Sequence, residues 1–317
     1  MYKSLDDADV IKTWRHGKLN EGDKSPFTTH NWVAAWSKAY EDSIDSLNII
    51  VGGDIESHMV LPLSLKGQLL SPVCTSATDY FDARGVYDKD LIAACVARAL
   101  VIAKSNRARL VMASIPPEAL LLKGLDEICR LTSEVQVKRE MSRQINLSLV
   151  SESQDLLSHD RRRTYIKRRR QLALRDACLE VSTPATAEDT KVALALHAKR
   201  WQARGVRTSF QDIRREKFIS HLLADHNIRT VMFKLKIGHE ELIAFRFGFL
   251  DRATYYDWWT SFDLQYQGYS PGFVLLGRSV DWLIGEGIGK FDFLRGDERY
   301  KSSWANEYKF LTTVELH

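Results

Sequence analysis

One stretch of this chain, residues 254 to 294, most constrains what it can fold into. It begins with TYYDWWTS, whose aromatic side chains predict a strand. The turn Tyr269-Ser270-Pro271-Gly272 then opens a segment whose apolar residues recur at intervals of three and four, which predicts a helix packed on a sheet. A second short strand follows at residues 290 to 294. Because two strands joined through a helix run parallel, the loop before the helix opens at the carboxyl end of the first strand, where α/β sheets bind ligands.

The turn that precedes this helix predicts an anion site. Pro271 suits the first helical turn, where its missing N–H costs nothing, and Ser270 before it can cap the helix. Free backbone N–H groups and the helix dipole together favour a phosphate at such a turn. We therefore expect Tyr269, Ser270, Pro271, Gly272 and Phe273 to bind the phosphates of a cofactor. An ordinary helix cap would use the same residues.

The run from YSPG through the helix to FDFLRGDERYKSSW resembles the acyltransferase domain of the GNAT superfamily. It is most similar to the CelD-like branch, which is associated with bacterial cellulose and surface-polysaccharide biosynthesis and is related to the peptidoglycan-bridge aminoacyltransferases. The resemblance is dense over about residues 186 to 310. It implies acetyl-CoA as the acyl donor. One difference is that QGYSPG, at residues 267 to 272, replaces the usual pyrophosphate loop, Arg/Gln-x-x-Gly-x-Gly/Ala.

The order of predicted elements indicates two lobes in a chain of 317 residues. Residues 151–317 are predicted to contain a strand, two helices, three antiparallel strands, a helix, a strand and a final strand, the order of a GNAT domain. Residues 1–150 show three strands, a helix, a strand, a helix and further strands, which we interpret as a degenerate copy. We therefore expect a mixed-sheet α/β fold of two tandem GNAT-like lobes. The first lacks a Pro-Gly turn before its helix near residue 91 and should hold no cofactor of its own.

Three residues near the predicted site could carry the chemistry of acyl transfer, which needs a base for the amine and an acid for the departing thiolate. Asp297 directly follows the second strand and is the favoured base, with Asp257 on the aromatic strand as the next candidate. Tyr300 is the candidate acid. Each carboxylate could instead form a salt bridge with Arg295, Lys301 or Arg246, and Tyr300 could be a core tyrosine.

Substrate contacts are expected from two further segments. The loop containing Asp79, Tyr80 and Asp82 resembles an acidic loop of the CelD-like branch, which implies recognition of the acceptor's ammonium or hydroxyl groups. An exposed turn with solvated aspartates is the alternative. Lys301 and Trp304 would orient the substrate or cofactor.

Basic charge is concentrated in one segment. The net charge is +4, but residues 160 to 175 hold eight basic residues and one acidic residue, so the rest of the chain sums to −3. The segment is predicted to be helical and has three interpretations: a solvated helix face, a phosphate-binding surface that includes Arg168, or a nucleic-acid surface. The absence of an interleaved aromatic ladder disfavours the last.

Composition excludes several classes of protein. No run of eighteen apolar residues is present, so we expect no transmembrane helix. The first residues lack the apolar core of a signal peptide, and the four cysteines lack CxxC spacing, which indicates a cytoplasmic protein with reduced thiols. His221 and His226 are the only pair near a metal-ligand spacing, and we expect no metal.

Together these features predict a cytoplasmic N-acyltransferase. We expect it to move an acetyl or other short acyl group from acyl-CoA to the amino group of an amino sugar, nucleotide-linked in the favoured case, for a bacterial surface polysaccharide. The sugar is implied by the resemblance alone. The alternatives are an aminoacyl-tRNA-dependent transferase and a non-catalytic accessory protein of polysaccharide synthesis.

Overall fold

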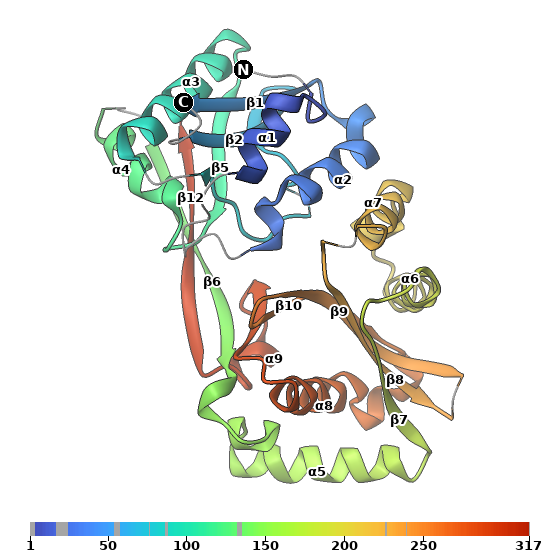
Figure 1. The fold of residues 1–317 in the computed structure, drawn as a ribbon. Coiled ribbons are helices and arrows are strands. Elements are labelled where there is room, and N and C mark those ends of the chain that lie inside the picture. The colour runs from blue at the N-terminus through green and yellow to red at the C-terminus, as the bar shows by residue number, and fades with distance from the viewer. Residues whose placement is uncertain are drawn as a thin grey trace. The chain divides into compact units, whose positions relative to one another are not determined.

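The computed structural model describes residues 4–16, 25–53, 58–75, 77–85, 88–131, 135–225, 227–238 and 240–316. The chain divides into two compact units, both drawn in Figure 1. Unit 1 comprises residues 1–141 and 309–317, and unit 2 comprises residues 142–308. Among the described residues, no helix is both long enough and apolar enough to cross a membrane.

Unit 1 is built on a mixed set of strands. They are β1 (Ser46–Gly53), β2 (His58–Lys66), β3 (Leu69–Pro72), β5 (Arg109–Ile115) and β12 (Glu307–Leu316), in that spatial order, with β4 (Arg84–Gly85) paired to β2. Only β3 and β5 run parallel in this set. The α-helices of the unit are α1 (Ala8–His16), α2 (His30–Tyr40), α3 (Lys89–Ser105) and α4 (Leu120–Leu131).

The observed units differ from the predicted division into residues 1–150 and 151–317. The last residues of the chain lie in unit 1 because β12 pairs antiparallel with β5, for example Thr312 with Ile115 and Val314 with Met112. A pairing between strands almost two hundred residues apart leaves no local pattern in the sequence.

Unit 2 contains the elements predicted for the GNAT-like half except the final strand, which is β12 and lies mostly in unit 1. Its strands follow the order β6 (Val135–Asn146, of which residues 142–146 belong to unit 2), β11 (Lys290–Arg295), β10 (Thr254–Phe262), β9 (Glu241–Asp251), β8 (Thr230–Ile237) and β7 (Ala177–Ser182). Its helices are α5 (His159–Ala173), α6 (Ala187–Gln202), α7 (Ile213–Leu223), α8 (Pro271–Gly285) and α9 (Arg299–Ser302). Helices α8 and α5 lie on one side of the strands and α6 and α7 on the other (Figure 1).

Strands β10 and β11 run parallel and are joined through α8, as the sequence predicted. They pair through only three residue pairs, ending at Tyr256 and Asp292. Beyond that point β10 continues to Phe262 along β9, with an irregularity in register between Asp257 and Trp259. The two strands therefore part beside the start of α8, which leaves room for a ligand at their carboxyl ends.

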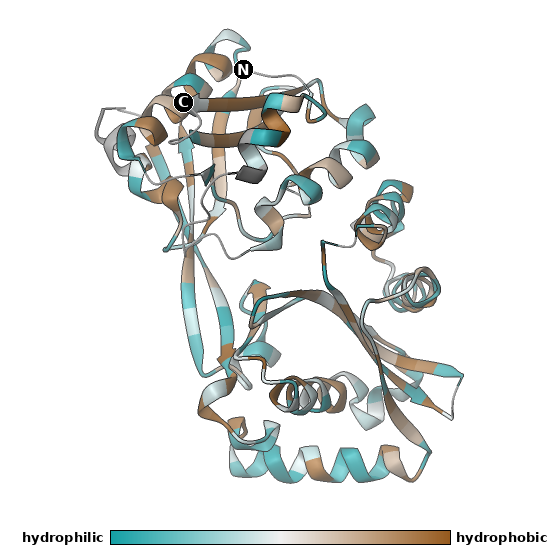
Figure 2. Cartoon of the chain, in the orientation of Figure 1, coloured by the Kyte–Doolittle hydropathy of each residue, from teal (hydrophilic) through white to brown (hydrophobic). Residues whose placement is uncertain are grey.

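Helix α5 packs closely against α8. Figure 2 shows that α5 is hydrophilic along most of its length, whereas β8, β9 and α8 are largely hydrophobic. Its two buried residues, Tyr165 and Leu172, face the core of unit 2. At Gly277 of α8 a β-carbon would lie 2.5 Å from the Tyr165 ring, so only glycine allows the helices to approach this closely.

Candidate active site

A cavity of about 310 Å³ lies where β10 ends and α8 begins, entirely within unit 2. Helix α6, strand β9, strand β10, the start of α8 and the segment around α9 all contribute side chains to it. Its lining residues are Arg200, Arg246, Thr260, Phe262, Gln267, Ser270, Gly272, Phe273, Leu276, Tyr300 and Trp304. Three of the five residues predicted to bind phosphates, Ser270, Gly272 and Phe273, are among them.

The start of α8 leaves one backbone donor unused. Ser270 adopts the left-handed conformation (φ 51°, ψ 54°), and its carbonyl accepts the N–H groups of Phe273 and Val274 at 3.0 and 3.2 Å. Its own N–H donates to the Gln267 carbonyl at 3.0 Å. Among the described residues the Gly272 N–H has no acceptor, so it remains available to a ligand.

The expected capping role of Ser270 is not seen, because its side chain accepts no backbone N–H of the helix. The left-handed backbone at Ser270 turns the side chain away from the capping geometry, which needs an extended residue. A β-carbon at Gly272 would make an ordinary contact with the Phe262 ring, at 3.4 Å. A larger side chain at this position would enter the cavity.

A buried ion pair lies beside the cavity, and its arginine lines the cavity. The side chains of Arg246 on β9 and Asp257 on β10 are each 2% exposed. Arg246 Nε donates to Asp257 Oδ1 at 3.1 Å, and Arg246 Nη2 contacts Asp257 Oδ2. Burial lowers the pKa of Arg246, but the charge and hydrogen bond of Asp257, together with nearby Tyr300 and Tyr255, raise the pKa above its usual value. Asp257 is therefore engaged by Arg246, the salt bridge considered as an alternative from the sequence.

The phenol of Tyr300 lies next to this ion pair. The residue is 38% exposed, but its hydroxyl end is buried and lies close to Arg246. Burial of the hydroxyl raises the pKa of Tyr300, and the charges of Asp257 and Glu298 raise it further, while Arg246 acts in the opposite direction. The phenol therefore stays protonated at neutral pH and can donate a hydrogen bond or proton into the cavity.

Asp297 lies outside the cavity. Its side chain is half exposed and forms an ion pair with Arg143, whose hydrogen bond lowers the pKa of Asp297. Asp297 and Tyr300 are three residues apart, a spacing that puts two side chains on one face of a helix. Helix α9 begins only at Arg299, with Glu298 as its N-cap, so this spacing does not bring the two side chains together.

Lys301 and Trp304 take different positions. The Lys301 ammonium is buried and engaged by the Arg295 carbonyl and by Glu298 Oε2 at 2.8 Å, so it holds the loop after β11 in place. Trp304 lines the cavity, is 1% exposed, and its indole N–H has no hydrogen-bond partner among the described residues. An unpartnered buried donor is costly, and a ligand acceptor would satisfy it.

The substrate residues predicted in the first lobe are engaged within unit 1. Asp82 is buried and accepts the backbone N–H groups of Leu120 and Leu121 at 2.9 and 2.8 Å, at the start of α4. Tyr80 is also buried, with Lys309 Nζ 4.1 Å from its ring centroid. Asp79 is half-buried.

Arg168 lies on α5 and is absent from the lining of the cavity. Its Nη1 donates to Gln171 Oε1 at 3.0 Å.

Sequence reasoning missed Arg200. It lies on α6 with its guanidinium 4.0 Å from the Phe262 ring centroid, and its Nε is buried without a hydrogen-bond partner among the described residues. Burial lowers the pKa of Arg200, and neighbouring Arg204 lowers it further. In sequence it looks like any basic residue of a surface helix. Arg246 was noted only as a salt-bridge partner, although an arginine inside the apolar run LIAFRFGFL is itself a signal of a buried polar site.

His197, on α6, lies outside the cavity lining and is held by two hydrogen-bond partners. Trp259 Nε1 donates to His197 Nδ1 at 3.0 Å, and His197 Nε2 lies 3.2 Å from Thr208 Oγ1. Burial, aided by the charge of Arg200, lowers the pKa of His197 to about 4, so the imidazole is neutral at physiological pH. Both ring nitrogens are engaged, which leaves no free nitrogen to act as a base.

Within the described residues, no group of three or more His, Cys, Asp and Glu side chains could hold a metal ion. His226, one member of the pair considered from the sequence, lies outside the described residues. Cys95 is a thiol whose pKa burial raises to about 11, so it is unreactive at neutral pH.

Comparison with known proteins agrees with this geometry. Residues 160–302 match a family model described as an acetyltransferase (GNAT) domain. A comparison with curated protein sequences found no match. Among solved structures, FemX is 12% identical with a TM-score of 0.63, covering 98% of this chain and 96% of its own.

Two further solved structures share the fold. A C-terminal domain of a lysylphosphatidylglycerol synthetase described as putative, from Agrobacterium fabrum, is 10% identical with a TM-score of 0.62, covering 90% of this chain and 92% of its own. A tandem GNAT protein from the clavulanic acid biosynthesis pathway is 10% identical with a TM-score of 0.55, covering 98% of this chain and 96% of its own.

These similarities confirm the predicted mixed α/β fold with tandem GNAT-like lobes. The family match lies wholly within unit 2, which also contains the cavity. Residues 160–302 of unit 2 are therefore similar to a GNAT acetyltransferase domain, and this similarity supports an acyltransferase.

Proposed function

We propose that the protein transfers an acyl group, acetyl in the simplest case, from acyl-CoA to the amino group of an amino sugar, nucleotide-linked in the favoured case. The observation that carries the acyl transfer is the cavity between β10 and α8, where Tyr300 and Arg246 present donors beside the parting strands. The amino sugar, and its use in a surface polysaccharide, rest on the resemblance of residues 186 to 310 to the CelD-like branch.

The residues around the cavity suit an acyl-CoA. The free N–H of Gly272 at the start of α8 would bind the phosphates of the acyl-CoA. Because this loop offers few free backbone N–H groups, the guanidinium of Arg200 would supply further hydrogen bonds to the same phosphates. Phe262 and Phe273 would contact the apolar part of the pantetheine arm, and the Trp304 N–H would meet an acceptor. When bound, the cofactor supplies a thioester whose acyl carbon an amine can attack.

We assign three roles to side chains of unit 2. Tyr300 donates its phenolic proton to the departing thiolate, Arg246 holds that hydroxyl in place, and Asp257 positions Arg246 through their buried ion pair. Asp257 is thus a positioning residue in this proposal.

Asp297 lies outside the cavity, and our proposal is that it receives the proton of the amine through water, since its carboxylate is ionised and half exposed. Asp297→Asn keeps the shape of the side chain and should lower kcat by about 10²-fold with CoA affinity unchanged. A wild-type kcat in that variant would return the role to water or to Asp257.

The direct test is thiol release from acetyl-CoA in the presence of free and nucleotide-linked amino sugars, with acetylation of the sugar amine verified by mass spectrometry. We expect release that depends on both substrates and disappears in Tyr300→Phe. If a folded protein that binds CoA released no thiol with any amino sugar, the sugar acceptor would be refuted.

A second candidate is an aminoacyl-tRNA-dependent transferase. Two observations favour it: the start of α8 offers one free amide where a pyrophosphate loop would offer several, and the fold matches FemX over nearly the whole chain. Aminoacyl transfer to an amine without any affinity for CoA would establish this candidate over the first.

A further inference from the structure

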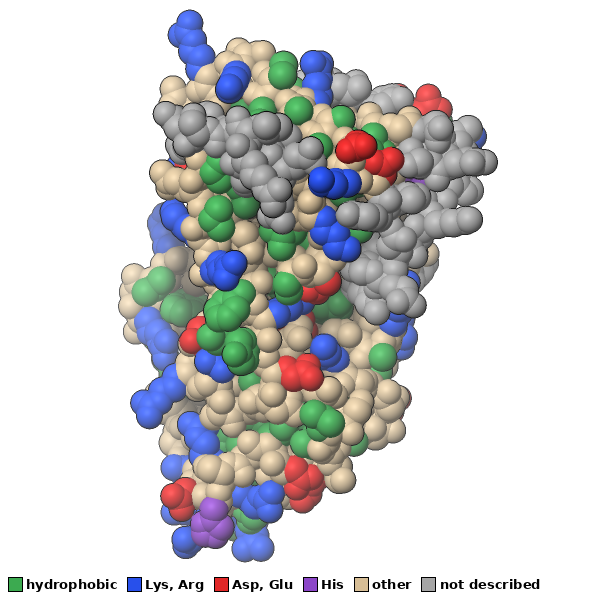
Figure 3. Space-filling model, turned by 90° about the vertical axis from the view of Figure 1, so that its left-hand side faces the viewer, with side chains coloured by type: hydrophobic (Ala, Val, Ile, Leu, Met, Phe, Trp, Pro, Cys, Tyr) green, Lys and Arg blue, Asp and Glu red, His purple; other side chains and the backbone are tan. Residues whose placement is uncertain are grey.

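The strongest feature that the proposed chemistry leaves unused is the charge of α5. Residues 160 to 175 carry a net charge of +7 in a chain whose remainder sums to −3. In Figure 1, α5 forms the outer layer of unit 2 beyond α8. Lys and Arg side chains, with Asp, Glu and His side chains among them, lie over the lower part of the face drawn in Figure 3. Repulsion among so many positive charges on one helix destabilises the folded protein unless a bound anion offsets it.

Some of these cations are used within unit 2. Arg161 lies 5.9 Å from the Phe273 ring centroid, and Arg162 donates to the Gln154 carbonyl at 2.9 Å. Arg175 donates to the Tyr269 hydroxyl at 2.5 Å. Four others are exposed and form no hydrogen bond or ion pair with the described residues: Arg163, Lys167, Arg169 and Arg170.

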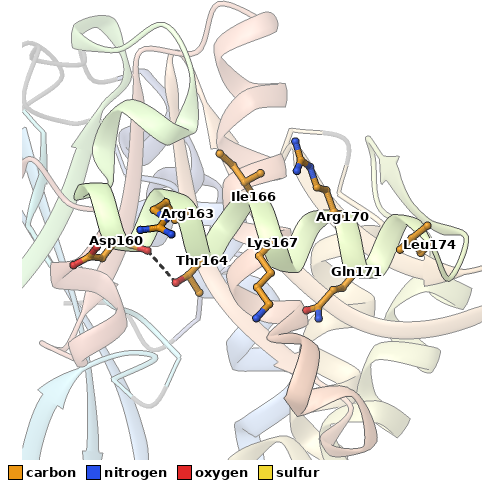
Figure 4. Close-up of a pocket in the computed structure, with 8 residues that line it drawn as sticks. All are labelled: Asp160, Arg163, Thr164, Ile166, Lys167, Arg170, Gln171 and Leu174. Carbon is orange, nitrogen blue, oxygen red and sulfur yellow. Dashed lines mark hydrogen bonds between the residues drawn. The ribbon is translucent and has the colours of Figure 1, made fainter.

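Helix geometry places most of the unused cations on one face. The buried residues Tyr165 and Leu172 mark the side of α5 that faces α8. Arg163, Lys167 and Arg170, spaced by four and three, lie on the opposite side. All three line one shallow surface depression, which Asp160 also lines. In Figure 4 Arg170 points up from the helix and Lys167 points down, with Arg163 near the start of the helix. We call this surface, with Leu174 at its end, the basic face.

The basic face also exposes aliphatic side chains. Leu174 is 89% exposed and lies in line with the three cations, and the half-buried Ile166 flanks them. An exposed leucine side chain has no hydrophobic stabilisation in water. At the boundary between lipid headgroups and acyl chains, burial of its apolar surface would stabilise it. Cations at the same surface pair with lipid phosphates.

The same composition disfavours a nucleic acid as the partner. Proteins that bind single-stranded nucleic acid stack bases on aromatic side chains between the cations, and no residue lining this face is aromatic. A straight helix of 15 residues, about 22 Å long, instead offers a line of charge that a flat anionic surface can contact along its whole length.

The basic face is preformed. The contact of Tyr165 with Gly277 and the burial of Leu172 fix α5 on α8, so binding would not require the helix to fold first. A preorganised surface loses little conformational entropy on binding. The line of charge is therefore a property of the folded protein.

We propose that the basic face of α5, formed by Arg163, Lys167, Arg170 and Leu174, docks the protein on an anionic phospholipid bilayer. The cations pair with lipid phosphates, and Leu174 enters the headgroup region. This binding is peripheral and electrostatic, so it weakens as salt rises. The proposal is independent of the acyl acceptor proposed above.

The test is co-sedimentation of the whole protein with vesicles of phosphatidylcholine alone and of phosphatidylcholine with about one quarter phosphatidylglycerol. We expect binding only to the anionic vesicles, reversed by high salt. The triple variant Arg163→Ala/Lys167→Ala/Arg170→Ala should bind on the order of 100-fold more weakly, at roughly five-fold for each cation. Leu174→Ser should weaken binding with no change in its salt dependence.

A matched control removes three exposed cations from unit 1, Lys66→Ala/Arg98→Ala/Lys104→Ala, for the same loss of net charge. Equal vesicle binding by the two triple variants would overturn the proposal, as would equal binding of the wild type to both kinds of vesicle. Retention of tRNA without any binding to anionic vesicles would assign the basic face to RNA instead. Circular dichroism checks that each variant is folded, and thiol release measured without vesicles reports the proposed function separately.

Discussion

The buried pair of Arg246 and Asp257 offers the sharpest test of the site. Asp257→Asn removes one charge from a pair whose side chains are each 2% exposed, so water cannot solvate the arginine that remains. Breaking a buried ion pair in this way typically costs about 3–5 kcal/mol, because an uncompensated charge stays behind. Against a total stability of about 5–15 kcal/mol, that is a large share.

The assay is equilibrium unfolding in urea, followed by tryptophan fluorescence, with the free energy of unfolding as the readout. The matched control is the double variant Arg246→Met/Asp257→Leu, which removes both charges and keeps the volume roughly constant. It should recover most of the lost stability, since replacing a buried pair by apolar residues is often neutral. It should nevertheless stay inactive, because Tyr300 then loses the guanidinium that holds its hydroxyl.

Two results would refute this reasoning. If Asp257→Asn unfolded within about 0.5 kcal/mol of wild type, the arginine would not be desolvated as the structure indicates. If the double variant kept a wild-type kcat, Arg246 would have no part in holding Tyr300.

Three further substitutions probe the rest of the site. Gly272→Val should abolish CoA binding in calorimetry while the protein stays folded, with Gly285→Ala, which meets open space, as control; unchanged affinity would move the phosphates elsewhere. Tyr300→Phe should lower kcat by about 10²-fold or more without weakening CoA binding, and an unaltered kcat would exclude it as the acid. The low pKa of His197 means that the unfolded chain binds an extra proton between about pH 4 and 6.5, so stability should fall by about 3 kcal/mol as pH drops through that range. His197→Gln, which keeps an acceptor for Trp259, should flatten this dependence, and an equally steep fall in urea midpoints would argue against it.

Local patterns predicted the part of the fold that positions the site. The parallel strands β10 and β11 and the helix between them follow from aromatic runs, three-and-four periodicity and a Pro-Gly turn, all of which act within a few residues. Tyr300 and Trp304 line the cavity, and their assignment as site residues stays a prediction.

The tertiary structure decided which charged groups the site contains. Arg200 reaches it from α6, and Asp257 meets Arg246 beside an irregularity in the β10–β9 register, so neither placement depends on neighbours in sequence. Asp297 pairs with Arg143 outside the cavity, two residues before helix α9 begins.

The sequence by itself therefore determined the elements, the parallel crossover and the concentration of charge on α5, because each depends on residues close together along the chain. Only the tertiary structure decided that β12 returns to β5, that Arg246 is buried with Asp257, and that the basic face points outward. Those outcomes depend on burial and on contacts between distant segments. The desolvation cost of a charged side chain depends on its surroundings in the folded protein, so the sequence alone does not give it.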